Sequence, residues 1–446
     1  MNHPARRFLA AVLLALLPCR PSFATNPLIT DQFTADPTAR VFDGRVYVYP
    51  SHDIIATPGK GRPGWFCMED YHVFSSENLT DWQDHGVIVS QNAVDWVKPD
   101  SYSMWAPDCV AKDGRYYFYF PALARVGRGF GIGVAIGDSP AGPFTPQPTP
   151  IEGAHGIDPC VFIDRDGTAY LYYAARKIFV AKLKPNLLEL DGPPQALANL
   201  PAKGLIEGPF VFERNGIYYL TYPHAANRTE RLEYATGRSP LGPFTPAGVL
   251  MDESPDGCWT NHQSIVEFHG QWYLFYHDKD LSPDFDKARS VRADRLSFNA
   301  DGTIQKVIPT LRGVGVVAAT AEIQIDRYSA TSEKDVTVSF LDSSNPHRGW
   351  KISLAAKNSW VRFDDVDFGR GALKSVRVRA LAPTGGTIEI HADAADHPVL
   401  ARVKIGRDAA WQTATAKVRH VPAGTHDLIV TRSGNDPVEL DWLSFE

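Results

Sequence analysis

Cysteine is scarce in this sequence, and positive charge is not in surplus. The 446 residues include five cysteines, and their 45 Lys and Arg are outnumbered by 51 Asp and Glu. The net charge of −6 offers no broad basic footprint, which argues against a nucleic-acid-binding protein. The cysteines after residue 24 are scattered and lack the spacing of metal ligands: Cys67, Cys109, Cys160 and Cys258. We therefore expect no structural disulfide framework.

Long apolar runs are also missing once the N-terminus is passed, so no later segment is predicted to span a membrane. The apolar run over residues 8–18 is too short to do so and follows Arg6 and Arg7. A small-x-small pattern ends at Ala24. Together these features predict a secretory signal peptide over residues 1–24, with export to the periplasm or the extracellular space.

No long segment shows the 3.6-residue period of an amphipathic helix, and strand patterns dominate instead. Five stretches share one layout, an apolar strand, a Gly turn and an aromatic strand. They are "TADPTARVFDGRVYVYPSHD" (34–53), "WAPDCVAKDGRYYFYFPA" (105–122), "GIDPCVFIDRDGTAYLYYAA" (156–175), "LIEGPFVFERNGIYYLTYPH" (205–224) and "TNHQSIVEFHGQWYLFYHD" (260–278). A second repeated element appears in "DSPAGPFTP" (138–146) and "RSPLGPFTP" (238–246). This periodicity predicts a β-propeller of five blades.

Polar residues recur at one position of this repeat, eight or nine residues before the turn glycine. The five residues there are Asp36, Ala106, Asp158, Glu207 and His262. The first strand of each propeller blade lines the central axis, so we expect these residues to converge. An acidic residue at one strand head often only caps a turn. Three carboxylates in one register favour a functional site instead, because gathering like charges is costly.

Converging carboxylates beside aromatic residues suggest glycoside hydrolysis. That reaction uses one protonated carboxyl group, which gives its proton to the leaving oxygen, and one ionised carboxylate. In enzymes that invert the anomeric carbon, the two carboxyl groups are roughly 6.5–9.5 Å apart, which leaves room for the attacking water. A third carboxylate can raise the pKa of the acid by like-charge repulsion.

The segment from about residue 26 to 315 resembles glycoside hydrolase family 43, a family of five-bladed propellers. The motif "ADP" matches the family's general base and implies that role for Asp36. "GIDP" matches its pKa-modulating Asp and implies that role for Asp158, and "IEGP" matches its general acid and implies that role for Glu207.

The same resemblance implies further residues of a sugar pocket. Trp105, in the family's blade-two signature "WAPD", would line the pocket or pack between blades. His262, in "TNHQS", matches an axial histidine near the pocket floor that can touch a water or a central metal ion, or be a buried core histidine. Arg289 could hold a substrate hydroxyl, Arg292 could do so equally, and either could be a surface charge.

The tail over about residues 320–446 resembles carbohydrate-binding module family 6, a jelly-roll β-sandwich. The matching stretches include "AEIQIDRYS" (321–329) and "NDPVELDWLSF" (435–445). The resemblance implies a structural Ca²⁺ held by Glu322, Gln324 and Asp441, with Gln324 standing where many members have Glu. It also implies a glycan site at Trp360, Trp411 and Asn435, although a sandwich core would use tryptophans as well.

The sequence as a whole therefore predicts an all-β protein with a signal peptide over 1–24, a five-bladed propeller over 25–317 and a β-sandwich module over 320–446. The leading hypothesis is a secreted inverting glycosidase that removes α-L-arabinofuranosyl or β-xylosyl units from plant polysaccharides such as arabinoxylan or arabinan. It needs no organic cofactor. Three alternatives stay open: action on another glycan such as galactan, a non-catalytic glycan-binding protein, and a transferase that uses activated sugars. Linkage, mode of attack and oligomeric state are not determined.

Overall fold

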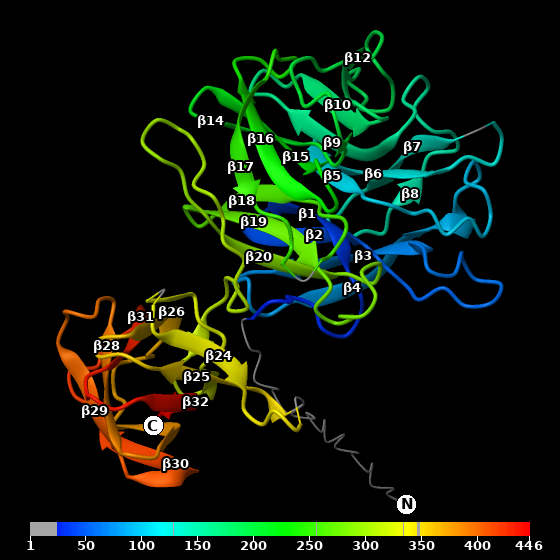
Figure 1. Cartoon of the computed structure of the whole chain (residues 1–446). Helices are drawn as coiled ribbons and strands as arrows, with labels where there is room; N and C mark the ends of the chain where they lie inside the picture. Colours follow the sequence, from blue (N-terminus) through cyan, green and yellow to red (C-terminus); the bar gives the residue numbers. More distant parts are fainter. Residues whose placement is uncertain (1–24, 128, 256, 333, 346–347) are drawn as a thin grey trace, which may run out of the picture.

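The computed structural model describes residues 25–127, 129–255, 257–332, 334–345 and 348–446. The predicted signal peptide lies outside these residues. Strands and loops make up nearly all of the described chain, with one short 3₁₀ helix at Gln91–Ala93. Figure 1 shows the strands up to β20 in one body and those from β24 onward in a second, smaller body. In the described part of the chain, no helix is long and apolar enough to cross a bilayer.

Five antiparallel sheets follow one another along the first body. The first holds β1 (Ala35–Phe42), β2 (Arg45–Ser51), β3 (Asp70–Ser76) and β4 (Gln83–Ser90). The second holds β5 (Asp108–Lys112), β6 (Arg115–Leu123), β7 (Phe130–Gly137) and β8 (Thr145–Pro146). The third holds β9 (Ile157–Ile163), β10 (Ala169–Ala174), β11 (Ile178–Lys182) and β12 (Gln195–Ala196). The fourth holds β13 (Leu205–Ile206), β14 (Phe210–Arg214), β15 (Ile217–Ala225), β16 (Arg231–Gly237) and β17 (Thr245–Met251), and the fifth β18 (Ser264–Phe268), β19 (Gln271–Asp278) and β20 (Ser290–Leu296).

Each sequence repeat forms the first hairpin of one sheet. In four of the five, both turn residues have positive φ, as a two-residue type I′ turn requires: Asp43-Gly44, Asp113-Gly114, Asn215-Gly216 and His269-Gly270. The apolar strand of the repeat is the inner one. β1 contacts β5, β5 contacts β9, β9 contacts β14, β14 contacts β18, and β18 contacts β1.

The second repeated element joins neighbouring sheets. The Tyr49 hydroxyl on β2 donates to the carbonyl of Pro140, in the first "SPxGPFTP" segment, over 2.6 Å. The Tyr172 hydroxyl on β10 donates in the same way to Pro240, in the second such segment. Both tyrosines are fully buried. The aromatic strands thus fill the space between sheets, and their hydroxyls find the partners that buried polar groups require.

A buried ion pair links the inner strands of three consecutive sheets. The Arg40 guanidinium on β1 donates to both oxygens of Asp108 on β5, at 2.8 and 2.7 Å from Nη2. Asp108 also accepts the backbone N–H of Val161 on β9 over 2.6 Å. Asp108 is fully buried, so its charge depends on these donors.

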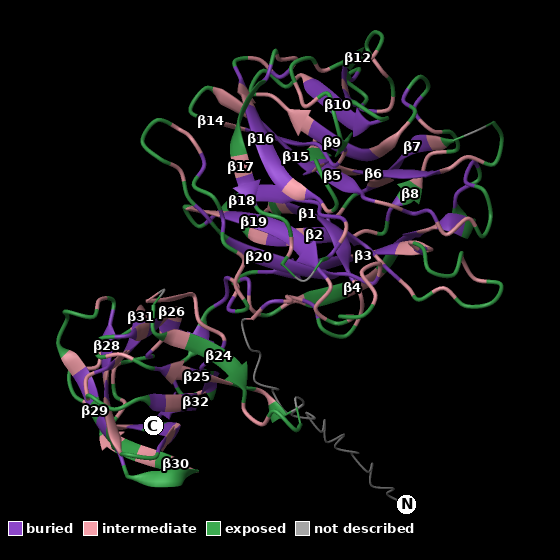
Figure 2. Cartoon of the chain, viewed as in Figure 1, coloured by how far each residue is buried: buried purple, intermediate pink, exposed green. Residues whose placement is uncertain are grey.

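The second body contains two mixed or antiparallel six-stranded sheets that share one hydrophobic cluster. One holds β21 (Val317–Ala318), β23 (Ala330–Thr331), β26 (Trp360–Asp367), β28 (Gly386–Ala392), β29 (Val399–Ile405) and β31 (Thr425–Arg432). The other holds β22 (Ile323–Gln324), β24 (Val336–Phe340), β25 (Trp350–Leu354), β27 (Ser375–Ala382), β30 (Asp408–Lys417) and β32 (Val438–Phe445). Figure 2 shows that β24 and β30 are largely exposed.

Hydrogen bonds join the two bodies. Arg312, after the last strand of the first body, donates to the carbonyl of Asp364 on β26 over 2.7 Å. Arg295 on β20 forms an ion pair with Asp365, which also lies on β26. The four cysteines in the described residues are free and buried.

We expect the Arg40–Asp108 pair to contribute strongly to stability. Arg40→Met leaves the buried Asp108 charge without its partner, which should lower the free energy of unfolding by about 3–5 kcal/mol in urea denaturation. Arg45→Met is the matched control, because Arg45 forms a more exposed pair with Glu77. The control should lose less than about 1 kcal/mol. Equal losses in the two variants would contradict the importance of burial here.

Candidate active site

One cavity of about 200 Å³ in the first body collects all the catalytic and sugar-contacting residues predicted there, Arg292 excepted. Its lining includes Asp36, Asp158, Glu207, Trp105, His262 and Arg289. Arg292 is not part of the lining and pairs instead with Asp280. The repeat register therefore did bring residues from five separate segments to one place.

Asp36 lies at the start of β1 with a left-handed backbone (φ 45°). Its oxygens accept hydrogen bonds from Arg289 Nη1 over 2.7 Å and from the Ser51 hydroxyl over 2.7 Å. Burial alone would raise the pKa of Asp36, but Arg289, the nearby histidines His262 and His277 and the Ser51 hydroxyl together outweigh burial and lower this pKa to about 2. Asp36 is therefore ionised over the whole physiological range.

Arg289 is clamped between two buried carboxylates. Its Nε and Nη2 donate to Asp53 over 2.9 and 3.0 Å, and Nη1 donates to Asp36. Arg289 is 2% exposed and Asp53 is 1% exposed, so water does not compete for these bonds. The bonds of Arg289 thus go mainly to carboxylates of the protein, which suits a positioning role better than binding of a sugar hydroxyl.

Asp158 lies at the start of β9 with the same left-handed backbone as Asp36 (φ 55°). It accepts the N–H of Gly208 over 2.9 Å. Burial and then repulsion from Glu207 raise the pKa of Asp158 well above its ordinary value. Gly208 has a positive φ, and an added Cβ would lie 2.8 Å from Pro223, so only glycine fits beside Glu207.

Glu207 sits beside a fourth carboxyl group, that of Glu230. Glu230 is fully buried just before β16 and accepts the N–H of Asn261 over 2.7 Å. Its Oε1 has no hydrogen-bond partner in the described part of the chain, and its carboxyl lies within hydrogen-bonding reach of Glu207. Burial raises the pKa of Glu230 to about 8. Burial and then Glu230 raise the pKa of Glu207 well above its ordinary value.

Two neutral histidines lie beside Asp36: His262 lines the cavity, and His277 contacts the Asp36 backbone. His277 Nδ1 accepts the N–H of Asp36 over 3.0 Å, which leaves its Nε2–H to donate to the carbonyl of Thr260 over 3.0 Å. Burial and then Arg289 lower the pKa of His277 to about 3. Burial lowers the pKa of His262 to about 4. Arg289 is therefore the main positive charge close to the carboxylates.

Aromatic rings form the rest of the lining. Trp65, Phe66 and Trp259 join Trp105 around the cavity. Phe66 and Trp259 are stacked with centroids 6.0 Å apart, and Phe66 meets Trp105 at 6.2 Å. Such flat apolar walls beside charged groups match the ring faces and hydroxyls of a sugar.

Sequence reasoning missed several polar or aromatic residues in or beside the cavity, among them Asp53, Phe66, Glu230, Trp259 and His277. Asp53 ends the first repeat stretch and Trp259 directly precedes the "TNHQS" motif, so their places beside known motifs were a usable signal. Glu230 lies outside the repeated register. No pattern in the sequence connects it to Glu207.

The predicted glycan site of the second body is spread over its two sheets. Trp360 begins β26 in one sheet, and Trp411 lies on β30 in the other, under the Arg379 guanidinium. Asn435 is exposed in the loop before β32. Within the described residues no ring contact joins the two tryptophans. An aromatic pair outside the prediction, Phe340 and Trp350, is exposed, with ring centroids 4.2 Å apart and planes tilted by 30°.

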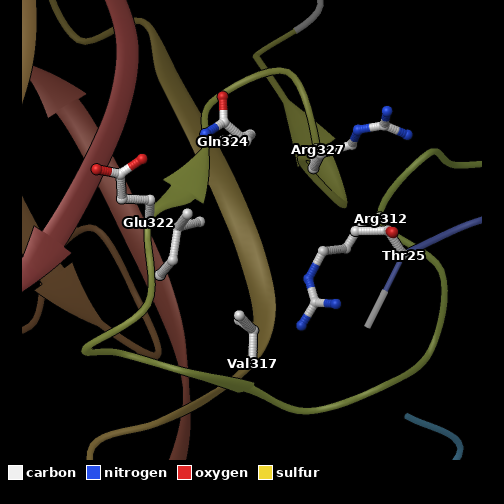
Figure 3. Close-up of a pocket in the computed structure, with 7 residues that line it drawn as sticks. Thr25, Arg312, Val317, Glu322, Gln324 and Arg327 are labelled. Carbon is white, nitrogen blue, oxygen red and sulfur yellow. The ribbon is translucent and has the colours of Figure 1, made fainter. Parts of the chain in front are cut away.

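The predicted calcium ligands are close to a pocket at the junction of the two bodies. Glu322 and Gln324 line this pocket, where Arg312 and Arg327 lie on the other side (Figure 3). Asp441 lies on β32 and pairs with Arg379. Burial raises the pKa of Asp441, and Asp326 and Glu322 are near enough to add to this by repulsion. The donor set is therefore oxygen-rich, as calcium prefers, but Arg379 already balances part of its charge.

A metal ion beside His262 finds less support in the geometry. Among the described residues, no group of three close His, Cys, Asp or Glu side chains includes His262. No catalytic step is therefore assigned to a metal at this position.

Comparison with known proteins agrees with this geometry. The pattern described as "Glycosyl hydrolases family 43" matches residues 24–304, and "Carbohydrate binding module (family 6)" matches residues 329–446. Xylosidase/arabinosidase 43A of Humicola insolens is 39% identical over 62% of this chain and 98% of its own length. Arabinoxylan arabinofuranohydrolase of Bacillus subtilis is 28% identical over 87% of this chain and 85% of its own.

Solved structures give the same result. A family 43 β-xylosidase/α-arabinofuranosidase from a compost metagenome, in complex with xylotriose, is 37% identical with a TM-score of 0.58, covering 64% of this chain and 98% of its own. The Bacillus subtilis arabinoxylan arabinofuranohydrolase, in complex with cellotetraose, has a TM-score of 0.56 at 25% identity, covering 95% of this chain and 97% of its own. The chain therefore belongs to glycosyl hydrolase family 43 and carries a family 6 carbohydrate-binding module behind its hydrolase region.

Proposed function

We propose that this glycosidase removes terminal α-L-arabinofuranosyl or β-xylosyl units from plant polysaccharides, with inversion at the anomeric carbon. The observation that carries the proposal is the contrast between two carboxyl groups in one cavity. Asp36 is held ionised by Arg289, whereas Glu207 is held protonated by burial and by Glu230. The names of the relatives support pentose as the sugar class.

In the proposed reaction, Glu207 donates its proton to the leaving oxygen. Asp36 accepts a proton from the water that attacks the anomeric carbon from the opposite side. Arg289 holds Asp36 in place, and Ser51 fixes its second oxygen. The hydrogen bonds from Arg289 and Ser51 lower the basicity of Asp36, so its orientation toward the water is what makes it effective.

Asp158 and Glu230 act on Glu207 rather than on the sugar. Both are buried carboxyl groups close to it, and like charges this close in a buried site cannot all ionise. The pair formed by Glu207 and Glu230 therefore keeps a proton to a higher pH than an isolated glutamate. Trp105 lines the cavity and offers a flat ring face to the sugar, whereas its indole N–H is buried and has no hydrogen-bond partner in the described chain.

The size of the cavity supports removal of single units from chain ends or side chains. Pockets that take drug-sized ligands measure roughly 300–1,000 Å³. The cavity here, at about 200 Å³, suits one sugar ring. A purely glycan-binding protein is disfavoured, because it has no use for four carboxyl groups around such a ring.

The proposal extends to the rest of the chain. The cyclic contacts of the five inner strands support a five-bladed propeller over about residues 25–317, and the shared core of the two later sheets supports a β-sandwich over 320–446. A signal peptide over 1–24 would export the protein. Glu322, Gln324 and Asp441 would hold a structural Ca²⁺ that ties β22 to β32, with no part in hydrolysis.

Substitution of the acid and of the base should have different effects. Glu207→Ala should keep far more activity on an aryl glycoside with a good leaving group than on an oligosaccharide, because only the poor leaving group needs the proton. Asp36→Ala should lose both activities together, by about 10²–10⁴-fold. The measurement is kcat/KM on nitrophenyl α-L-arabinofuranoside and β-xyloside and on arabinoxylan, arabinan and galactan oligosaccharides.

The first-formed sugar tests the stereochemistry of the same reaction. NMR during hydrolysis by the unmodified enzyme should show the inverted anomer before mutarotation. Retention would mean that a carboxylate acts as a nucleophile and that Asp36 is not a base. Turnover of galactan alone would overturn the pentose assignment.

The pH profile should report on Glu230. Activity requires Glu207 in its protonated form. The rate therefore falls as the pH rises through the pKa of Glu207. Glu230→Gln removes a neighbouring carboxylate and should lower this pKa, which moves the alkaline limb of kcat/KM to lower pH by about one unit. Glu233→Gln, on β16 and paired with His224 and Arg231, is the control and should leave the limb in place. An unmoved limb in Glu230→Gln would show that Glu230 does not act on Glu207.

Two aromatic rings of the module should carry glycan retention, those of the exposed Trp350 and the partly exposed Trp411. Trp350→Ala and Trp411→Ala should each weaken the retardation of the full-length protein in an arabinoxylan affinity gel, because sugar rings stack on exposed aromatic faces. His420→Ala, an exposed change in the same module, is the control. Activity on a soluble aryl glycoside should stay unchanged in all three. Retardation equal to that of the unmodified protein would remove the tested residue from the site.

A further inference from the structure

A cluster of two histidines and an aspartate lies next to, but outside, the lining of the catalytic cavity. His52 directly follows β2, and Asp70 and His72 point the same way from β3, two residues apart. One potential ligand atom of each lies within 4.8 Å of the others. In the described part of the chain, no other group of three His, Cys, Asp or Glu side chains comes this close.

The three side chains are close together and partly exposed to solvent. His52 Nδ1 lies 2.6 Å from Asp70 Oδ1, and the two imidazole rings meet edge to face with centroids 4.8 Å apart. The side chains of His52, Asp70 and His72 are 19%, 15% and 15% exposed. An ion can therefore reach them without rearrangement of the fold.

A fourth residue orients one of the imidazoles. Asp84 on β4 lies with both oxygens 3.0 Å from His72 Nδ1. Asp84 is itself fixed by the N–H of Gly86 over 2.7 Å and by the Gln32 amide over 3.0 Å. As hydrogen-bond acceptor, Asp84 places a proton on Nδ1 and leaves the Nε2 lone pair of His72 free. A carboxylate behind a histidine in this way is the usual surrounding of a metal-bound imidazole.

We propose that His52, Asp70 and His72 bind one divalent transition-metal ion of the Zn²⁺ class. Two imidazole nitrogens and one carboxylate oxygen are the ligands that zinc and similar ions accept, with a water in the remaining position. Ca²⁺ does not suit this site, because it takes oxygen ligands almost exclusively. A simple His52–Asp70 ion pair would explain the short contact between them, but it leaves the oriented Nε2 of His72 without a use.

The test uses the full-length protein, free of affinity tags and stripped with EDTA. Titration calorimetry with ZnCl₂ should show one site, and the melting temperature should rise with Zn²⁺ concentration as expected for a ligand of the folded state. CaCl₂ in excess should not compete. Co²⁺ should give visible d–d absorption of four- or five-coordinate geometry, which reports on the unmodified protein directly.

Three substitutions complete the test. His72→Ala should abolish binding, and Asp84→Asn should weaken it by about 10–100-fold, because it removes only the orienting carboxylate. His85→Ala is the matched control on the same sheet, where His85 contacts Ser75 and not the cluster. Absence of Zn²⁺ binding at about 100 µM, a six-coordinate Co²⁺ spectrum, or binding that survives His72→Ala would each overturn the proposal.

Discussion

The catalytic region depends on one guanidinium group, that of Arg289, buried among five carboxyl groups. Asp36 and Asp53 take nearly all of its hydrogen bonds, and Asp158, Glu207 and Glu230 lie close by without an ion-pair partner among the described residues. Buried charges persist only when they are compensated. The two carboxylates on Arg289 can therefore stay ionised, whereas the remaining three must share protons. The different protonation of Asp36 and Glu207 thus follows from where the single guanidinium lies.

The three central carboxylates could be predicted from the sequence because they occupy one position of a repeat. The repeat fixes the fold and, through the fold, the convergence of that position. Asp53, Glu230 and His277 could not be found in this way, because their roles depend on neighbours brought in by tertiary packing. The sequence predicts Arg289 as a site residue that binds a sugar hydroxyl. In the structure Arg289 instead pairs with Asp53 and Asp36, which suits a positioning role.

The second body shows the limit of reading residue types along a strand. Successive side chains point to opposite faces, and one bulge reverses the pattern. β26 has such an irregularity between Phe363 and Val366, and β27 has one beside Arg379. The pairing of β27 with β30 is also irregular, next to Trp411 on β30. A tryptophan on β26 or β30 can therefore face the core or the solvent. The exposed residues Phe340 and Trp350 lie side by side because β24 pairs with β25, and the sequence alone does not give that pairing.

The alternation of side chains also links two regions described above. Ser51, His52 and Asp53 are consecutive, yet Ser51 and Asp53 bind Asp36 and Arg289 while His52 points to Asp70. An ion on His52 and a sugar beside Asp36 would then act on opposite sides of the same three residues. Thermodynamic linkage makes such an effect mutual: whatever factor the ion imposes on the affinity for the sugar, the sugar imposes on the affinity for the ion.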